Sequence, residues 1–164
     1  MQNAKDTFYI TLRDRIAALN PARTVVIRNT TRPGVLVEEN ELATATETPD
    51  AFRLRWVGAK IDVAGPMPLV TLQCEIRYAT DGNSGNGGMD RGRLLSAMDA
   101  ELASAVGTAP QNAPKLNYAA TAPTSMATNI FWGDLTFDSV TVNGERLERT
   151  ATIDVFTYRE SGEL

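Results

Sequence analysis

The segment Leu69-Val-Thr-Leu-Gln-Cys-Glu-Ile-Arg-Tyr-Ala-Thr80 decides the fold, because apolar and polar side chains alternate along most of its length. The apolar positions share one face: Val70, Leu72, Cys74, Ile76 and Tyr78. The polar positions share the other: Thr71, Gln73, Glu75 and Arg77. A period of two predicts a β-strand with one buried face and one face open to water or to a partner.

Two amphipathic helices flank the predicted strands. Their apolar positions recur at helical spacing: Phe8, Leu12, Ile16 and Leu19 in the first, and Leu95, Met98, Leu102 and Val106 in the second. Asn20-Pro21 ends the first helix, because a residue before proline avoids helical dihedral angles. The second helix begins at Asp90 and ends at Gly107, a residue that often terminates helices.

Further strands follow from shorter patterns in 23–28, 52–57, 129–137 and the segment from 139 to about 159, where Asn143-Gly144 marks a hairpin. Residues 52–57 should pair with 69–80 in antiparallel orientation. Segments 31–34, 43–50 and 58–67 have the composition of turns or loops. Helices beside such strands, without βαβ alternation, predict an α+β fold: a mostly antiparallel four-to-five-stranded sheet with two helices packed on one face.

The chain of 164 residues predicts one domain, 1–164, with flexible loops at about 81–88 and 108–128. The first loop is rich in glycine and asparagine, and the second contains three prolines and few large apolar residues. Structureless segments as long as the second one are uncommon in a folded domain, and they usually indicate binding or disorder.

Composition narrows the class of partner. The net charge of −4 disfavours a protein that binds nucleic acid through its phosphates. No apolar run is long enough to cross a membrane, and the first residues lack the apolar core of a signal peptide, so we expect synthesis in the cytoplasm. Arginine outnumbers lysine by 13 to 3, which fits either a protein interface or GC-rich coding.

Catalytic chemistry has little support in the sequence. Histidine is absent, which removes the commonest general base and most zinc sites, and Cys74 lies on the apolar face of its strand. The spacing of the acidic residues Glu38, Glu39 and Glu41 does not match that of a calcium-binding loop. This group is interpreted as an acidic rim that faces solvent or a partner. We therefore expect no catalytic, cofactor or metal site, and no enzymatic activity.

The order of elements, with three segments, resembles a known family. These segments are the apolar-then-acidic stretch 32–40, the strand 69–80 with its loop and helix, and the closing strands 129–137 and 149–159, which end in Thr157-Tyr158-Arg159-Glu160. The chain is similar to the tail terminator (minor tail protein U-like) family of long-tailed bacteriophages. The Ala/Pro/Thr-rich segment 108–128 departs from the pattern of that family.

The resemblance implies a hexameric ring that caps the tail tube, stops its polymerisation and joins the tail to the head. The implied partners are copies of the chain, a tail tube protein and a head–tail connector protein. The implied location is the host cytoplasm during assembly and then the virion tail or a prophage-encoded tail particle. Two alternatives stay open: another head–tail joining or tail tube component, and an α+β domain that binds a small molecule or acts as an enzyme.

A ring requires two different complementary patches on each subunit. We expect the arginines on the polar strand faces to form one patch and the acidic rim to form the other, with further contacts at the second helix. The candidate interface residues are Glu38, Glu39, Glu41, Arg53, Arg55, Arg77, Arg91 and Arg93. Opposite charges would steer assembly, so Glu38→Lys with Glu39→Lys is predicted to weaken self-association without unfolding the domain.

Overall fold

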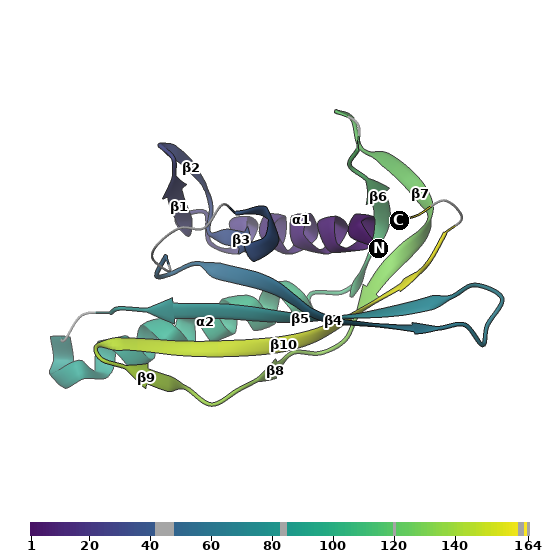
Figure 1. Cartoon of the computed structure of the whole chain (residues 1–164). Coiled ribbons are helices and arrows are strands. Elements are labelled where there is room, and N and C mark those ends of the chain that lie inside the picture. Colours follow the sequence, from purple (N-terminus) through teal and green to yellow (C-terminus); the bar gives the residue numbers. More distant parts are fainter. Residues whose placement is uncertain (42–47, 83–84, 120, 161–162, 164) are drawn as a thin grey trace.

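Figure 1 shows a computed structural model of the chain, which describes residues 1–41, 48–82, 85–119, 121–160 and 163. The fold is α+β, as predicted, and combines two α-helices with a strongly curled sheet in this part of the chain. The helical elements are α1 (Gln2–Leu19), α2 (Met89–Gly107) and the 3-10 turns η1 (Glu38–Asn40) and η2 (Gly85–Gly88). None of the described helices is long and apolar enough to span a bilayer.

The main sheet has eight strands among the described residues, six of them in the order β3-β4-β5-β10-β7-β6. Their bounds are β3 (Val35–Val37), β4 (Phe52–Asp62), β5 (Leu69–Thr80), β6 (Asn112–Asn117), β7 (Thr124–Trp132), β8 (Thr136–Phe137), β9 (Thr141–Asn143) and β10 (Arg146–Tyr158). The strands β8 and β9 pair with β10, and β3 is parallel to β4. The predicted sheet of four to five strands is therefore wrong: the sheet is larger, and it is mixed because β3 is parallel to β4, although its other pairings are antiparallel.

The strand β5 confirms the alternation that its sequence predicts. It pairs antiparallel with β4 on one side and with β10 on the other. Its apolar face lies in one buried cluster with side chains of both helices, including Phe8 and Ile16 of α1 and Met98 and Leu102 of α2. We call this side of β4, β5 and β10 the inner face, and the opposite side the outer face.

The predicted loop 108–128 is wrong, because most of it forms the hairpin of β6 and β7. The prolines of this segment argued against a strand, because proline has no amide hydrogen to donate. However, β6 is an edge strand and Pro114 is exposed on it, and at an edge the missing amide hydrogen is tolerated. In the other predicted loop, residues 83–84 lie outside the described part, and Gly85–Gly88 form the turn η2. Residues 42–47 of the predicted loop 43–50 also lie outside it.

A second hairpin occupies the segment that was predicted as a turn at 31–34. The strands β1 (Thr24–Ile27) and β2 (Thr30–Pro33) pair as a separate two-stranded sheet. The turn falls at Arg28 and Asn29, whose φ angles of 51° and 62° are both positive. Two consecutive residues in that region make a tight two-residue connection, so the chain reverses earlier than the proline and glycine of 31–34 suggest.

The strand β4 extends beyond its predicted end at residue 57. A β-bulge shifts the register between Trp56 and Gly58, and pairing with β5 then continues to Asp62. Figure 1 shows the far ends of β4 and β5 projecting from the body of the fold. We call residues 57–68 the arm. The predicted connection 58–67 is thus wrong in its first half, which is strand.

Candidate functional site

The outer face of the central strands carries the charged residues that the sequence placed there. Arg53 on β4 lies directly opposite Arg77 on β5, and Arg55 lies directly opposite Glu75. On the other side of β5, Thr150 of β10 is the neighbour of Arg77. The apolar cluster that includes both helices lies on the inner face, so these polar side chains form a separate surface.

The arginines of the outer face differ in their partners. The Nη2 atom of Arg77 lies 2.7 Å from a carboxylate oxygen of Glu75, and the Nε atom of Arg55 lies 3.9 Å from one of Glu38. Within the described residues, Arg53 has no carboxylate partner, and its Nε atom is buried without a hydrogen-bond acceptor. Arg53 is therefore the outer-face arginine whose charge is least compensated.

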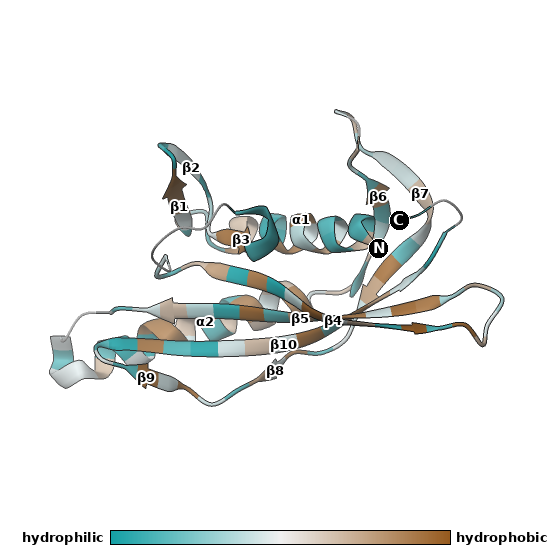
Figure 2. Cartoon of the chain, viewed as in Figure 1, coloured by the Kyte–Doolittle hydropathy of each residue, from teal (hydrophilic) through white to brown (hydrophobic). Residues whose placement is uncertain are grey.

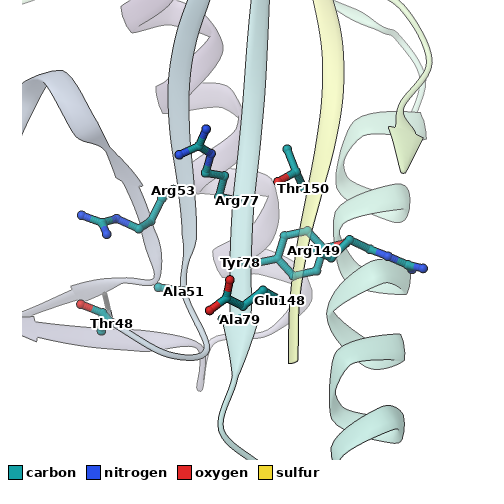
Figure 3. Close-up of a pocket in the computed structure, with 9 residues that line it drawn as sticks. All are labelled: Thr48, Ala51, Arg53, Arg77, Tyr78, Ala79, Glu148, Arg149 and Thr150. Carbon is teal, nitrogen blue, oxygen red and sulfur yellow. The ribbon is translucent and has the colours of Figure 1, made fainter. Parts of the chain in front are cut away.

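A pocket of about 220 Å³ opens beside this residue. Figure 3 shows its lining from the segment before β4 and from β4, β5 and β10: Thr48, Ala51, Arg53, Arg77, Tyr78, Ala79, Glu148, Arg149 and Thr150. The guanidinium groups of Arg53 and Arg77 lie on one side of β5, whereas that of Arg149 points away toward α2. The lining thus includes two cations on this side of β5, whose guanidinium groups point in different directions, and one carboxylate, that of Glu148.

The acidic rim lies in and beside η1, and each of its members has a cation within the same chain. Glu39 lies 3.3 Å from the Nζ atom of Lys5, and Glu41 lies 2.6 Å from Arg32. Glu38 is the partner of Arg55, so the two predicted patches meet within one subunit. These opposite charges partly neutralise each other within one chain, so less charge is available for pairing between subunits.

Arg91 and Arg93 lie elsewhere, in the first turns of α2. Arg91 is 3.5 Å from Glu145 in the turn between β9 and β10, and Arg93 is 3.4 Å from Asp90. Neither belongs to the lining of the pocket beside Arg53. The eight candidate residues therefore form two groups, one around β4 and the other at the start of α2.

The arm presents apolar side chains to solvent. Ile61 is 44% exposed and Val63 is 73% exposed, and Met67 is also exposed. A hollow of about 390 Å³, lined in part by Met67, Leu69 and Tyr158, lies at its base. Figure 2 shows hydrophobic positions along this hairpin. In the described chain, β3 pairs only with Phe52–Leu54 of β4, so the edge of β4 beyond them has no neighbouring strand.

A buried charge cluster was not predicted. The side chain of Lys115 on β6 is fully buried, and its Nζ atom lies 2.8 Å from a carboxylate oxygen of Glu163 and 3.3 Å from one of Glu160. It also donates a hydrogen bond of 2.7 Å to the carbonyl oxygen of Tyr158. Lysine is rarely buried, so the composition of 108–128 contained no signal for this inward position.

The environment of Glu160 changes its ionisation. Burial alone would raise its pKa, but hydrogen bonds from the Thr128 hydroxyl and from the backbone amides of Ala127 and Thr128 lower the pKa to about 2. The cation of Lys115 acts in the same direction. Glu160 is thus held as a carboxylate that joins the end of β10 to β7.

The inner face also holds a polar connection between sheet and helix. Tyr78 donates a hydrogen bond to Asp99 of α2, which also accepts one from Arg149 of β10. Burial and the Asp99 hydrogen bond raise the pKa of Tyr78. Burial likewise raises the pKa of the Cys74 thiol to about 12, so this thiol stays protonated and fits a core role. Among the described residues, no group of three metal-ligating side chains is suited to a metal ion.

A scan against protein-family models finds no match to this chain, and a search of the curated proteins finds none either.

Proposed function

We propose that the chain is a structural subunit of a bacteriophage tail or of a prophage-encoded tail particle. In this proposal, copies associate into a ring that caps the tail tube, stops its polymerisation and offers a face to the head connector. The sequence resemblance to tail terminators supports the phage role. The structural observation that carries self-association is the arm, with its exposed apolar side chains and its unpaired strand edge.

The arm adds little to the stability of a single subunit. A two-stranded ribbon is marginally stable on its own, and within the chain Ile61 remains 44% exposed and Val63 73% exposed. Exposed apolar surface that is grouped in one place commonly marks a contact with another protein. A partner that covers these two side chains would bury them and could also pair with the free edge of β4.

The opposite end of the molecule offers a second apolar region. Figure 1 places the start of α2 and the turn between β9 and β10 at the end away from the arm. The ion pair of Arg91 and Glu145 joins these elements, and exposed apolar residues of this end include Met89 and Val142. An arm of one copy seated on this region of the next would make a head-to-tail contact, which closes into a ring when the rotation allows.

The further partners in this proposal are a tail tube protein and a head–tail connector protein, met in the host cytoplasm during assembly and retained in the tail. The proposal assigns no catalytic step, no cofactor and no nucleic-acid or membrane ligand to the chain. It rests on association alone, and the mass of the protein in solution therefore tests it directly.

The test compares the wild-type chain with the double variant Ile61→Asp and Val63→Asp. We expect the wild type to show masses several times the 17.8 kDa of one chain as its concentration rises, measured by size exclusion with light scattering. The double variant should remain a folded monomer with only a small loss of stability, because Ile61 is half-buried and Val63 is mostly exposed. Val26→Asp, on the separate β1–β2 hairpin, is the matched control.

A wild-type chain that stays monomeric at all concentrations would contradict self-association. Assembly of the double variant like that of the wild type would contradict the role of the arm. A persistent monomer whose melting temperature rises with a small ligand would instead favour the alternative of a ligand-binding domain, since a ligand that binds only the folded state stabilises it.

A further inference from the structure

The pocket beside Arg53 places two like charges next to each other. Arg53 and Arg77 are direct cross-strand neighbours on the outer face, and both line the pocket. Like charges in that position destabilise a sheet. Glu75 compensates Arg77 at 2.7 Å, but no described carboxylate compensates Arg53. Among the described residues, Arg53 is therefore the cation at this point that has no carboxylate partner of its own, and the carboxylate of Glu148 lies in the same pocket lining.

The hydrogen-bonding capacity of Arg53 is also incompletely used. Its Nε atom is buried and has no acceptor in the described structure. A buried donor without an acceptor is unfavourable. Because the Nε atom is already out of reach of solvent, an acceptor that enters the pocket would accept hydrogen bonds from the terminal N–H groups of the two arginines and offset their charge.

The shape and the lining of the pocket indicate the class of that acceptor. A guanidinium group presents parallel N–H donors that match the two oxygens of a carboxylate or a phosphate. The hydroxyls of Thr48 and Thr150 lie in the same lining and can donate further hydrogen bonds. The volume of about 220 Å³ is below the ~300–1,000 Å³ of sites for drug-sized ligands, so a small group fits best.

Two other charged residues line the pocket, and they act differently. Arg149 is engaged with Asp99 and points toward α2, so it adds little to a ligand on the outer face. Glu148 brings a carboxylate, one oxygen of which accepts a hydrogen bond of 3.4 Å from Asn143. Glu148 would repel an anion, so removing its charge should tighten anion binding.

We propose that this pocket binds an oxyanion, with Arg53 and Arg77 as its two guanidinium ligands and Glu148 as the residue that limits its affinity. This inference goes beyond the proposed structural function and does not depend on it. The oxyanion is a phosphate group or the carboxylate of an acidic side chain, and these two sources share the same recognition chemistry.

The experiment titrates the full chain with inorganic phosphate and, separately, with succinate at constant ionic strength, using calorimetry and amide NMR shifts. We expect saturable binding with shifts centred on residues 51–53, 77–79 and 148–150. Arg53→Ala should weaken binding at least tenfold, and Arg53→Lys should weaken it less, because the charge remains while the two-pronged donor is lost. Glu148→Gln should tighten binding several-fold.

Arg55→Ala is the matched control, because Arg55 lies on the same face of β4 but does not line the pocket. It should bind like the wild type, and the melting temperatures of all variants show whether they are folded. Binding of phosphate alone or of succinate alone would identify the source of the group. Absence of saturable binding by both anions, equal losses in Arg53→Ala and Arg55→Ala, or no gain in Glu148→Gln would overturn the proposal.

Discussion

The two halves of β4 contain similar side chains in different surroundings. In the first half, Phe52 and Leu54 are fully buried in the cluster shared with both helices. In the second half, beyond the bulge, Ile61 points to the same side of the sheet as Val70 yet is 44% exposed. Pairing with β5 resumes after the bulge, but the body of the fold does not cover this second half.

This contrast separates two uses of apolar residues. Where α1 and α2 cover the sheet, an apolar side chain stabilises the domain by leaving water. Where they do not, the same kind of side chain contributes little to the domain and is available to a partner. Stability and association should therefore respond to substitutions in different halves of one strand.

The largest expected effect comes from truncating one side chain in each half. Leu54→Ala should lower the free energy of unfolding by about 2–5 kcal/mol, because it leaves a cavity in the core. Ile61→Ala should lower it by less than about 1 kcal/mol, because a half-exposed side chain loses much less burial. Urea denaturation of dilute protein measures both. Equal losses would show that the arm is part of the core and would remove the contrast.

A second test concerns the anchoring at the base of the arm. Tyr158 of β10 pairs with Leu69, and the amide of Arg159 donates a hydrogen bond of 2.9 Å to the carbonyl of Pro68. Glu160 follows directly, and its pKa of about 2 lies below the ordinary 4.5. Its ionised form therefore adds stability above pH 4.5, and this contribution is lost as the pH falls toward 2.

We expect the melting temperature to fall between pH 4.5 and 2, and to fall less steeply in Glu160→Gln than in the wild type. Glu145→Gln is the control, because the Glu145 side chain is 88% exposed and should leave the profile unchanged. The measurement is a series of thermal unfolding curves against pH. Profiles of Glu160→Gln and wild type that run parallel would show that this carboxylate does not link the strand ends.

The smallest expected effect is that of the acidic rim. Glu38 and Glu39 pair with Arg55 and Lys5 within the chain, and both pairs are partly exposed. Exchanging both glutamates for lysine should change stability by about 1 kcal/mol or less. We expect a weaker effect on association than from the arm variant, because the rim is partly neutralised internally. Light scattering measures the association. If this variant loses as much association as the arm variant, charge pairing between subunits contributes as much as the arm does.

The predictable parts of the fold are those in which one side of an element is buried. The strand β5 and the stripe of α2 were found because burial on one side and water on the other produce alternation or helical periodicity. The hairpin turn at Asn143-Gly144 was found because glycine can adopt its positive φ of 62°. In these places the local pattern and the tertiary environment agree.

The missed parts are those in which local and tertiary signals diverge. The first half of β7, from Thr124 to Asn129, is largely exposed, so no apolar alternation marks it as a strand. The arm continues through Gly58 because cross-strand pairing outweighs a residue that disfavours strands. The outer-face arginines were placed on the correct side, but the pocket beside Arg53 depends on Glu148 and Thr150, which lie far away in the sequence.

The bulge at Val57 sets the direction in which the arm leaves the body of the fold. Pairing resumes at Gly58 opposite Gln73, directly after Trp56 opposite Cys74, so the extra residue leaves every later side chain on its own side of the sheet. A bulge bends its strand and increases the local twist. One inserted residue thus sets where the arm points without altering its chemistry. In a head-to-tail assembly, that direction fixes the angle between successive copies, and with it the number of copies in a closed ring or the pitch of an open spiral.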